Sequence, residues 1–296
     1  MTRKWPICKK LFLKRKQLLH KIIYVTGITG FIGSNLLHHL LQKYNKVINF
    51  TRSKTLKIYE KDRTEEVDIS KDFFLQNPSN TLINLATLYN PNPSSVDELG
   101  NIIEANILFP ASVFSALDSL ENLKIVNALS YHQLLDFKAQ NVYSLSKELF
   151  KKFLDHQNSE IVNLYIFDTF GSGDTRNKVV DSFIKNIIAG NPISIPSNEI
   201  RINLSDVQPL CRSLIKSIDL PQGSYSLKSP DTISLEDLVK MIMEISNKKV
   251  DILTITTGSN YFDEIERFPE NIFLEDPSYN LRDSIKNRIK ELEDGI

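Results

Sequence analysis

Three glycines between a predicted strand and a predicted helix constrain the fold of this chain more than any other feature. Gly27, Gly30 and Gly33 follow an apolar, β-branched run at 22–25 and precede an amphipathic stretch over 31–41. Glycine permits positive φ, and a turn that opens a helix directs backbone N–H groups at an anion such as a pyrophosphate. GxxGxxG spacing alone is weak evidence, but its place between strand and helix predicts dinucleotide binding. The expected contacts at this turn are Gly27, Thr29, Gly30, Phe31, Ile32 and Gly33.

The rest of the first half alternates short apolar runs with helical patterns. Strands are predicted at 47–50, 66–68, 81–86, 124–127 and 161–167, and helices at 96–117 and 143–156. Strands that alternate with helices predict parallel βαβ units. Beyond residue 171 the chain becomes rich in Asn, Pro and Ser, with helices predicted at 179–189, 234–246 and 283–293. The expected fold is α/β: a Rossmann doubly wound parallel sheet over 21–170 and a smaller C-terminal α/β substrate-binding domain over 171–296.

Charge and cysteine content limit the partners of the chain. Its 36 Lys+Arg balance 36 Asp+Glu, so bulk attraction to nucleic acid or to an anionic membrane is not expected. Cys8 and Cys211 lie far apart, and the five histidines have no metal-ligand spacing, so neither a disulfide framework nor a metal site is expected. Residues 1–20 form a basic extension without a secretory signal, and no function is assigned to it. These features favour a cytoplasmic protein without membrane insertion.

The turn after the second predicted strand bears on the choice of cofactor. Where a carboxylate would hold an adenosine ribose, the sequence instead has Arg52 and Ser53. A guanidinium and a hydroxyl suit a 2′-phosphate, which predicts NADP(H) in preference to NAD(H). A solvated basic turn is the alternative. Asp68, after the third strand, either accepts a hydrogen bond from the adenine amine or caps a turn.

Tyr143 and Lys147 are four residues apart and therefore share one face of a predicted helix. A cation beside a phenol stabilises the phenolate, so Tyr143 can exchange a proton with an oxygen whose carbon exchanges hydride with a nicotinamide. Such pairs are common by chance. This pair starts the helix that follows the fifth strand of a dinucleotide-binding pattern, and that place favours a catalytic role.

The glycine turn and the Tyr143/Lys147 pair together resemble the extended short-chain dehydrogenase/reductase family of nucleotide-sugar epimerases, dehydratases and reductases. Segments 84–87, 170–174 and 201–206 are similar to further motifs of that family. The resemblance implies that Tyr143 and Lys147 are catalytic, and that the family's four-helix interface, here helices 96–117 and 143–156, forms a homodimer. It also implies cofactor contacts at Leu85, Ala86, Thr87, Asn106, Tyr143 and Lys147, and substrate contacts at Asp168 and Arg201. For Arg201, a surface salt bridge is the alternative.

One position departs from the family pattern. The family places a Ser or Thr before the Tyr-Lys pair to hold the reacting oxygen, and the best alignment puts Ala128 there, with Ser130 two residues later. Either Ser130 takes over this role, which we favour, or the site lacks the hydroxyl. Dehydratases carry an Asp-Glu pair directly after that residue, and Leu129 and Ser130 stand there instead. Dehydratase activity is therefore not expected.

The form of the Tyr143–Lys147 motif, its short spacing from Ser130 and the segment 168–171 resemble bacterial reductases of the CDP-abequose and CDP-paratose synthase type. That resemblance implies NADPH-dependent reduction of a CDP-linked 4-keto-deoxysugar for cell-surface polysaccharide, as in the O-antigen of lipopolysaccharide. Two alternatives stay open. One is a nucleotide-sugar 4-epimerase that retains NAD(H), and the other is a non-catalytic NADP(H)-binding protein.

Overall fold

The computed structural model describes residues 22–117, 122–134, 141–230, 232–256, 269–273 and 279–294. The basic extension 1–20 lies outside the described residues. The chain divides into two compact units. Of the described residues, the first unit contains those up to 129, then 141–163 and 217–223, and the second contains 130–134, 164–216 and those from 224 onwards.

The central element is an eight-stranded sheet with the order β12-β7-β6-β5-β1-β2-β3-β4. Its strands are β1 (Ile22–Thr26), β2 (Lys46–Phe50), β3 (Thr55–Glu60), β4 (Arg63–Asp68), β5 (Thr81–Asn84), β6 (Lys124–Ser130), β7 (Glu160–Ile166) and β12 (Gly223–Leu227). β1 pairs in parallel with β2 and β5, and β5 pairs in parallel with β6. Parallel strands with helices on both faces confirm the predicted Rossmann-type sheet.

The edge of this sheet differs from the expected parallel pattern. β3 and β4 form an antiparallel hairpin, and β3 also runs antiparallel to β2. The sequence predicts a single strand ending at Asp68, whereas the chain forms a further strand, β3, before it. Leu56 and Ile58 are buried and alternate with the half-buried Lys57 on β3, which is the period-two pattern of a strand with one covered face. Only two residues connect β3 to β4, so the strands must turn back on each other.

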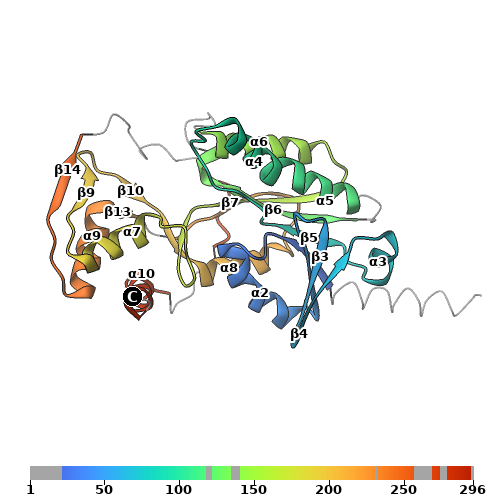
Figure 1. The fold of residues 1–296 in the computed structure, drawn as a ribbon, viewed down its shortest axis with the longest axis horizontal. Coiled ribbons are helices and arrows are strands. Elements are labelled where there is room, and N and C mark those ends of the chain that lie inside the picture. Colours follow the sequence, from blue (N-terminus) through green and yellow to red (C-terminus); the bar gives the residue numbers. More distant parts are fainter. Residues whose placement is uncertain are drawn as a thin grey trace, which may run out of the picture. The chain divides into compact units, whose positions relative to one another are not determined.

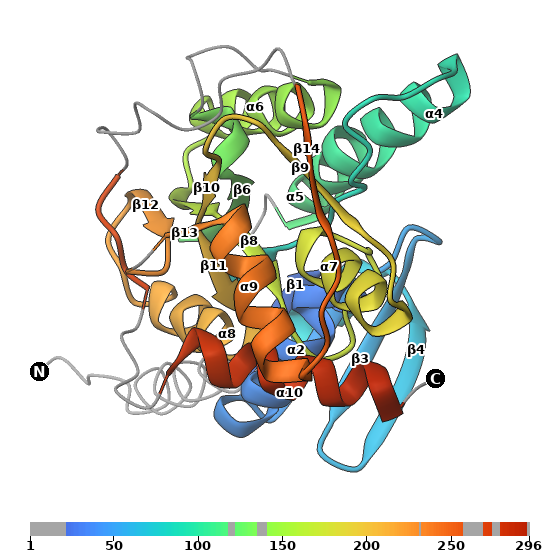
Figure 2. The same cartoon turned by 90° about the vertical axis from the view of Figure 1, so that its left-hand side faces the viewer.

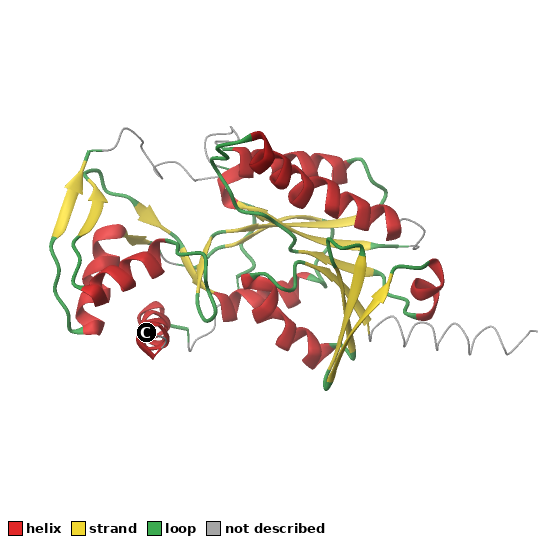
Figure 3. Ribbon diagram, in the orientation of Figure 1, coloured by secondary structure: helices red, strands yellow, loops and turns green. Residues whose placement is uncertain are grey.

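Helices cover both faces of the sheet in the first unit (Figures 1 and 3). α2 (Phe31–Lys43) lies on one face, and α4 (Val96–Ile103), α5 (Phe109–Leu117) and α6 (Val142–Asp155) lie on the other. A π-helical turn at Glu104–Leu108 joins α4 to α5, so the predicted helix over 96–117 is confirmed with a local irregularity. The short α3 (Lys71–Gln76) was not predicted.

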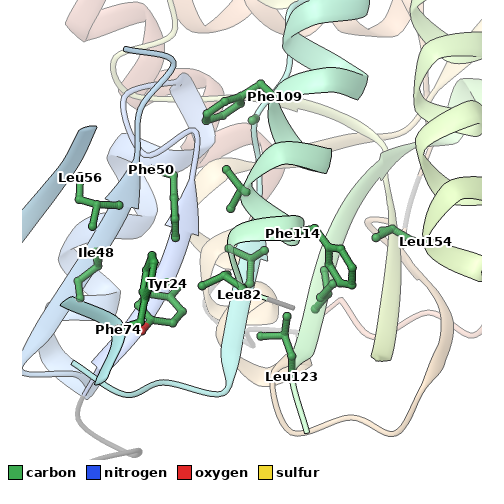
Figure 4. Close-up of a cluster of buried hydrophobic side chains, with 14 of the residues drawn as sticks. Tyr24, Ile48, Phe50, Leu56, Phe74, Leu82, Phe109, Phe114, Leu123 and Leu154 are labelled. Carbon is green, nitrogen blue, oxygen red and sulfur yellow. The ribbon is translucent and has the colours of Figure 1, made fainter. Parts of the chain in front are cut away.

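The core of the first unit is aromatic at its centre (Figure 4). The Tyr24 ring meets the rings of Phe50 and Phe74 edge-on, with centroids 5.8 and 5.9 Å away. The Tyr24 hydroxyl donates to the Asn77 carbonyl at 2.6 Å, so the phenol keeps a partner when it is buried. This packing fixes β1, whose carboxyl end begins the glycine turn.

The second unit has its own apolar core. Its helices and short strands face the viewer in Figure 2. Its helices are α7 (Val179–Ala189), α8 (Val207–Ser217), α9 (Leu235–Ser246) and α10 (Leu281–Asp294). Short strand pairs complete the unit: β8 (Asp168–Phe170) with β11 (Leu204–Asp206), β9 (Ile193–Pro196) with β14 (Ile252–Ile255), and β10 (Arg201–Ile202) with β13 (Ile233–Ser234). The three predicted helices are confirmed as α7, α9 and α10, whereas α8 was missed.

Candidate active site

The glycine turn fits close approach of a phosphate because two of its positions exclude any side chain. Gly27 has φ +75°, and a Cβ there would lie 2.7 Å from the Ala86 nitrogen. A Cβ on Gly33 would lie 2.6 Å from the Ile28 Cα. Gly30 is the N-cap of α2, and its N–H donates to the Gly27 carbonyl at 3.0 Å. The turn therefore brings bare backbone to the positive end of a 13-residue helix, where a pyrophosphate is favoured.

Lys147 is the most deeply buried charged group of the first unit's site. Its side chain rises from α6, and its ammonium donates to the carbonyl oxygens of Ala86 and Ala128, both at 3.2 Å. Only 3% of the residue is exposed, and this burial lowers the pKa of Lys147 to about 8. Tyr143, one turn earlier on the same helix, is 9% exposed. The predicted pair is thus buried on one face of α6.

Ala86 connects the glycine turn to Lys147. Gly27 packs against the backbone of Leu85 and Ala86, and the Ala86 carbonyl accepts from Lys147. The Ala86 N–H donates to the Thr26 hydroxyl at 3.1 Å. A dinucleotide held at the turn would therefore lie beside the strand end that holds the lysine.

Asn106, in the π-helical turn, organises the chain after β5. Its side-chain carbonyl accepts from the Leu88 N–H at 2.6 Å and from the Thr87 hydroxyl at 3.3 Å. Its amide donates to the Leu88 carbonyl at 3.2 Å and to the Ser146 hydroxyl at 2.8 Å. Asn106 thus joins the segment after β5 to α6, which carries the Tyr-Lys pair. π-helical turns are frequent at functional sites.

A buried row of polar side chains crosses the sheet, and sequence reasoning missed it. The Thr26 hydroxyl donates to Asn84 at 2.6 Å, Asn84 donates to Asn127 at 2.9 Å, and Asn127 donates to Asn163 at 3.1 Å. On the next strand, the Asn49 side chain accepts from the Ile28 N–H of the glycine turn at 3.2 Å. A signal was present, because β2, β5, β6 and β7 each carry an Asn after two aliphatic residues.

The residues expected at the adenosine end lie on the β2–β3 turn and the adjoining hairpin. Arg52 and Ser53 are both exposed, and the Ser53 hydroxyl is 2.7 Å from the Thr51 hydroxyl. Asp68 is exposed and pairs in register with Thr55, just after that turn. The structure therefore places Arg52, Ser53 and Asp68 at the same end of the β3–β4 hairpin.

Ser130 ends β6 and belongs to the second unit. Its hydroxyl accepts from the His132 N–H at 3.4 Å, and its own N–H donates to the Gln133 side chain at 3.0 Å. Ser130 is thus the N-cap of a short 3₁₀ turn over Tyr131–Gln133. For His132, whose N–H makes this contact, burial of the imidazole is the main cause that lowers its pKa.

The two expected substrate contacts are in the second unit as well. Asp168 accepts from the Tyr131 hydroxyl at 2.8 Å and lies 3.9 Å from the Lys178 ammonium. Arg201 forms a 3.0 Å ion pair with Glu199 and donates to the Thr232 carbonyl at 3.0 Å. The surface salt bridge that was the alternative interpretation of Arg201 is therefore present.

A predominantly parallel sheet, a glycine turn suited to a phosphate and a buried Tyr-Lys pair define a class of dinucleotide-dependent oxidoreductase. The sequence model of the NAD dependent epimerase/dehydratase family matches residues 23–203, more than half of the chain. The chain belongs to this family, so the resemblance found in the sequence is confirmed. It is an enzyme of the extended short-chain dehydrogenase/reductase type, and its cofactor is a nicotinamide dinucleotide.

Two curated relatives are similar over most of the chain. CDP-abequose synthase of Yersinia pseudotuberculosis is 24% identical over 246 residues, which cover 78% of this chain and 86% of the relative. UDP-2-acetamido-2,6-beta-L-arabino-hexul-4-ose reductase of Pseudomonas aeruginosa is 24% identical over 269 residues, which cover 86% and 67%. Among solved structures, the UDP-glucuronic acid 4-epimerase of Bacillus cereus, in complex with UDP-glucuronic acid and NAD, superposes with a TM-score of 0.72. It is 14% identical, and the match covers 93% of this chain and all of that chain, which shows a common fold.

Proposed function

We propose that this enzyme uses NADPH to reduce a nucleotide-linked 4-keto-deoxysugar of the CDP-3,6-dideoxyhexose type, for synthesis of a cell-surface polysaccharide such as O-antigen. The observation that carries the proposal is that Ala86 contacts both the glycine turn, through Gly27, and the ammonium group of Lys147. Both curated relatives bear on the choice of reaction, since one is named a CDP-abequose synthase and the other a ketosugar reductase. NADPH in place of a retained NAD(H) rests on Arg52 and Ser53, which suit a 2′-phosphate.

The glycine turn and the first turn of α2 would hold the cofactor pyrophosphate, and the bound cofactor supplies hydride. Tyr143 gives its phenolic proton to the C4 oxygen, so that the ketone gains a hydride and a proton and leaves as an alcohol. Lys147 supplies positive charge on the same helix face as Tyr143, which stabilises the phenolate left behind. Asn106 holds the chain after β5 against α6, which keeps the Tyr-Lys pair in place.

Three further contacts complete the proposal. Ser130 hydrogen-bonds the reacting oxygen in place of the hydroxyl missing at Ala128. Asp168, which accepts a hydrogen bond from Tyr131, accepts a second one from a hydroxyl of the nucleotide sugar. Arg201 forms an ion pair with the diphosphate of the same substrate. An arginine exchanges a surface carboxylate for a phosphate at little cost, because exposed ion pairs contribute little.

We also propose that the enzyme is a cytoplasmic homodimer. In the part of the chain described, one helical stretch, Val96–Leu117, is long and apolar enough by length and composition to cross a membrane. Core helices of globular proteins meet the same criteria, and this stretch buries Ile102, Val113 and Leu117. The same stretch packs against α6. Both the stretch and α6 also carry a stripe of exposed apolar residues. The exposed apolar residues are Val96, Leu99, Ile103 and Leu108 on the first helix and Leu145, Leu149 and Phe153 on α6.

A second copy would cover these stripes, because large exposed apolar patches mark interaction sites. A reducing cytoplasm agrees with the cysteine content of the chain, because Cys8 and Cys211 lie far apart in sequence and form no disulfide framework. Light scattering of the purified protein, beside a Leu149→Glu variant, tests the homodimer. A monomeric wild type would refute it.

The reaction is tested by following NADPH oxidation with purified protein and a panel of CDP-, dTDP- and GDP-linked 4-keto-6-deoxy sugars. We expect stoichiometric oxidation with a CDP-linked substrate, and loss of oxidation in Tyr143→Phe. Interconversion of two nucleotide sugars without net oxidation would identify an epimerase instead. Tight cofactor binding without any turnover would identify a non-catalytic NADP(H)-binding protein.

A further inference from the structure

Tyr89 lies directly beside the proposed proton donor. Its ring meets the Tyr143 ring edge-on, with centroids 4.9 Å apart and an interplanar angle of 73°. Tyr143 is buried, whereas 45% of Tyr89 is exposed. Tyr89 therefore presents exposed aromatic surface directly beside the ring of Tyr143.

The backbone on both sides of Tyr89 is anchored. Leu88 exchanges two hydrogen bonds with the Asn106 side chain, at 2.6 and 3.2 Å. On the other side, the Asn90 amide donates to Glu98 at 3.2 Å, and the Ser94 N–H donates to the same carboxylate oxygen at 2.8 Å. The Ser94 N–H is also the main cause that lowers the pKa of Glu98, so this anchor is charged at neutral pH.

A half-exposed aromatic ring on an anchored segment is suited to binding a ligand. Fixing the ring in advance removes the entropy that binding would otherwise cost, and an aromatic face gains most from contact with CH₂ and CH₃ groups. A hydroxyl placed against the same face loses its water without gaining a partner. The ring thus favours substrate carbons that lack a hydroxyl.

We propose that Tyr89 is a specificity-determining residue that packs against the ketone-bearing sugar ring and selects for a deoxy position next to C4. This inference rests on the proposed function and deepens it. The proton of Tyr143 goes to the C4 oxygen, so the carbons adjoining C4 come within reach of a ring centred 4.9 Å from that of Tyr143. In a 3,6-dideoxy sugar, these neighbours carry a CH₂ at C3 and a methyl group on C5.

The test compares three proteins, namely wild type, Tyr89→Ala and Tyr89→Phe, each loaded with NADP⁺ so that no reduction occurs. Calorimetric titration measures the affinity for CDP, for CDP-4-keto-3,6-dideoxyglucose and for CDP-4-keto-6-deoxyglucose. We expect the wild type to prefer the dideoxy sugar by about tenfold to a hundredfold. Tyr89→Ala should lose this preference while its affinities for CDP and NADP⁺ stay unchanged, and Tyr89→Phe, which keeps the ring, should retain it.

Three results would overturn the inference. One is an unchanged preference in Tyr89→Ala, and another is an equal loss of affinity for CDP, the sugars and NADP⁺, which marks a residue that only supports the fold. A wild type that binds neither sugar more tightly than CDP also refutes it. The proposed function fails separately, when the NADPH-loaded wild type binds the dideoxy ketosugar in preference and does not reduce it.

Discussion

The Lys147 ammonium donates to the carbonyl oxygen of Ala128 at 3.2 Å, so Ala128, which the sequence predicts at the family's hydroxyl position, contributes main chain to the surroundings of Lys147. Ala128 and Ser130 are two residues apart on β6 and therefore point to the same face of the sheet. The strand rise places them about 6.6 Å apart along β6. Ser130 thus lies one strand repeat beyond Ala128, toward the carboxyl end of β6.

We expect Ser130→Ala to lower kcat for ketosugar reduction by about tenfold to a hundredfold, because one hydrogen bond to the developing oxyanion is lost. The same change removes the cap of the 3₁₀ turn, which costs about 1 kcal/mol of stability. Steady-state kinetics and thermal unfolding separate the two effects. Ser130→Thr keeps the hydroxyl and serves as the control. A kcat within twofold of wild type in Ser130→Ala would show that the site works without this donor.

Because Lys147 is buried, we expect the free energy of unfolding to depend on pH. The pKa of Lys147 falls from 10.5 to about 8 on folding, which corresponds to about 3 kcal/mol at most. Below about pH 8 both states carry the proton, and the buried ammonium lowers the free energy of unfolding. Between about pH 8 and 10.5 the unfolded chain keeps the proton that the folded protein has lost, so the contribution of this group rises with pH.

Lys147→Met removes this titration. We expect the free energy of unfolding of the wild type, minus that of the variant, to increase as the pH rises from about 7 to about 10. Urea unfolding of both proteins across this range measures the difference. Loss of the hydrogen bonds to Ala86 and Ala128 changes this difference by the same amount at every pH. The test is therefore the slope of the difference against pH. A flat difference would contradict the lowered pKa.

The sequence predicted the elements that depend on local pattern. Gly27 and Gly33 are recognisable because only glycine fits beside the Ala86 and Ile28 backbone, and α6 is recognisable from its periodicity. The end of β4 was predicted but β3 was missed, because the two-residue connection at 61–62 contains no glycine or proline that would mark a turn between two strands. The contact of Tyr89 with Tyr143 joins residues 54 positions apart, and no local pattern specifies such a pair.

Arg52 should determine the choice between NADPH and NADH. Loss of a charge-assisted bond to the 2′-phosphate costs about 1.5–3 kcal/mol, so Arg52→Ala should raise the Kd for NADPH by about tenfold to a hundredfold. The Kd for NADH should not change, because NADH lacks that phosphate. Fluorescence titration with both cofactors makes the comparison. Arg63→Ala is the matched control, since Arg63 lies at the far end of the same hairpin and pairs with Glu65. Equal weakening of both cofactors in Arg52→Ala would contradict this assignment.

The asparagine row across the sheet should respond in a graded way to substitution. Asn127→Leu leaves a donor on Asn84 and an acceptor on Asn163 without their partner, and two such buried groups cost about 2–4 kcal/mol. Asn163→Leu, at the end of the row, breaks only one of these bonds and should cost about half as much. Urea unfolding compares the two variants. Equal costs would mean that cavity and shape effects, rather than the hydrogen bonds, determine the loss.

Arg288 on α10 should be essential to the stability of the second unit. Its guanidinium donates to both carboxylate oxygens of Asp181, at 2.9 and 2.5 Å, and to the Asp174 carbonyl at 2.6 Å. The exposed fractions of the two side chains are 3% and 1%. Arg288→Met leaves the Asp181 carboxylate buried without its counterion, so we expect a loss of about 3–5 kcal/mol in the free energy of unfolding.

The control for this prediction lies on the same helix. Arg282 pairs with Glu244 at 3.0 Å, but half or more of each side chain is exposed, so Arg282→Met should cost at most about 1 kcal/mol. The double variant Arg288→Met with Asp181→Leu removes both buried charges and should recover most of the lost stability, because the penalty of the single variant comes from the unpaired carboxylate. Urea unfolding of the wild type, the two single variants and the double variant measures these free energies. A double variant as unstable as Arg288→Met would mean that α10 is held by the bond from Arg288 to Asp174, and not by charge compensation at Asp181.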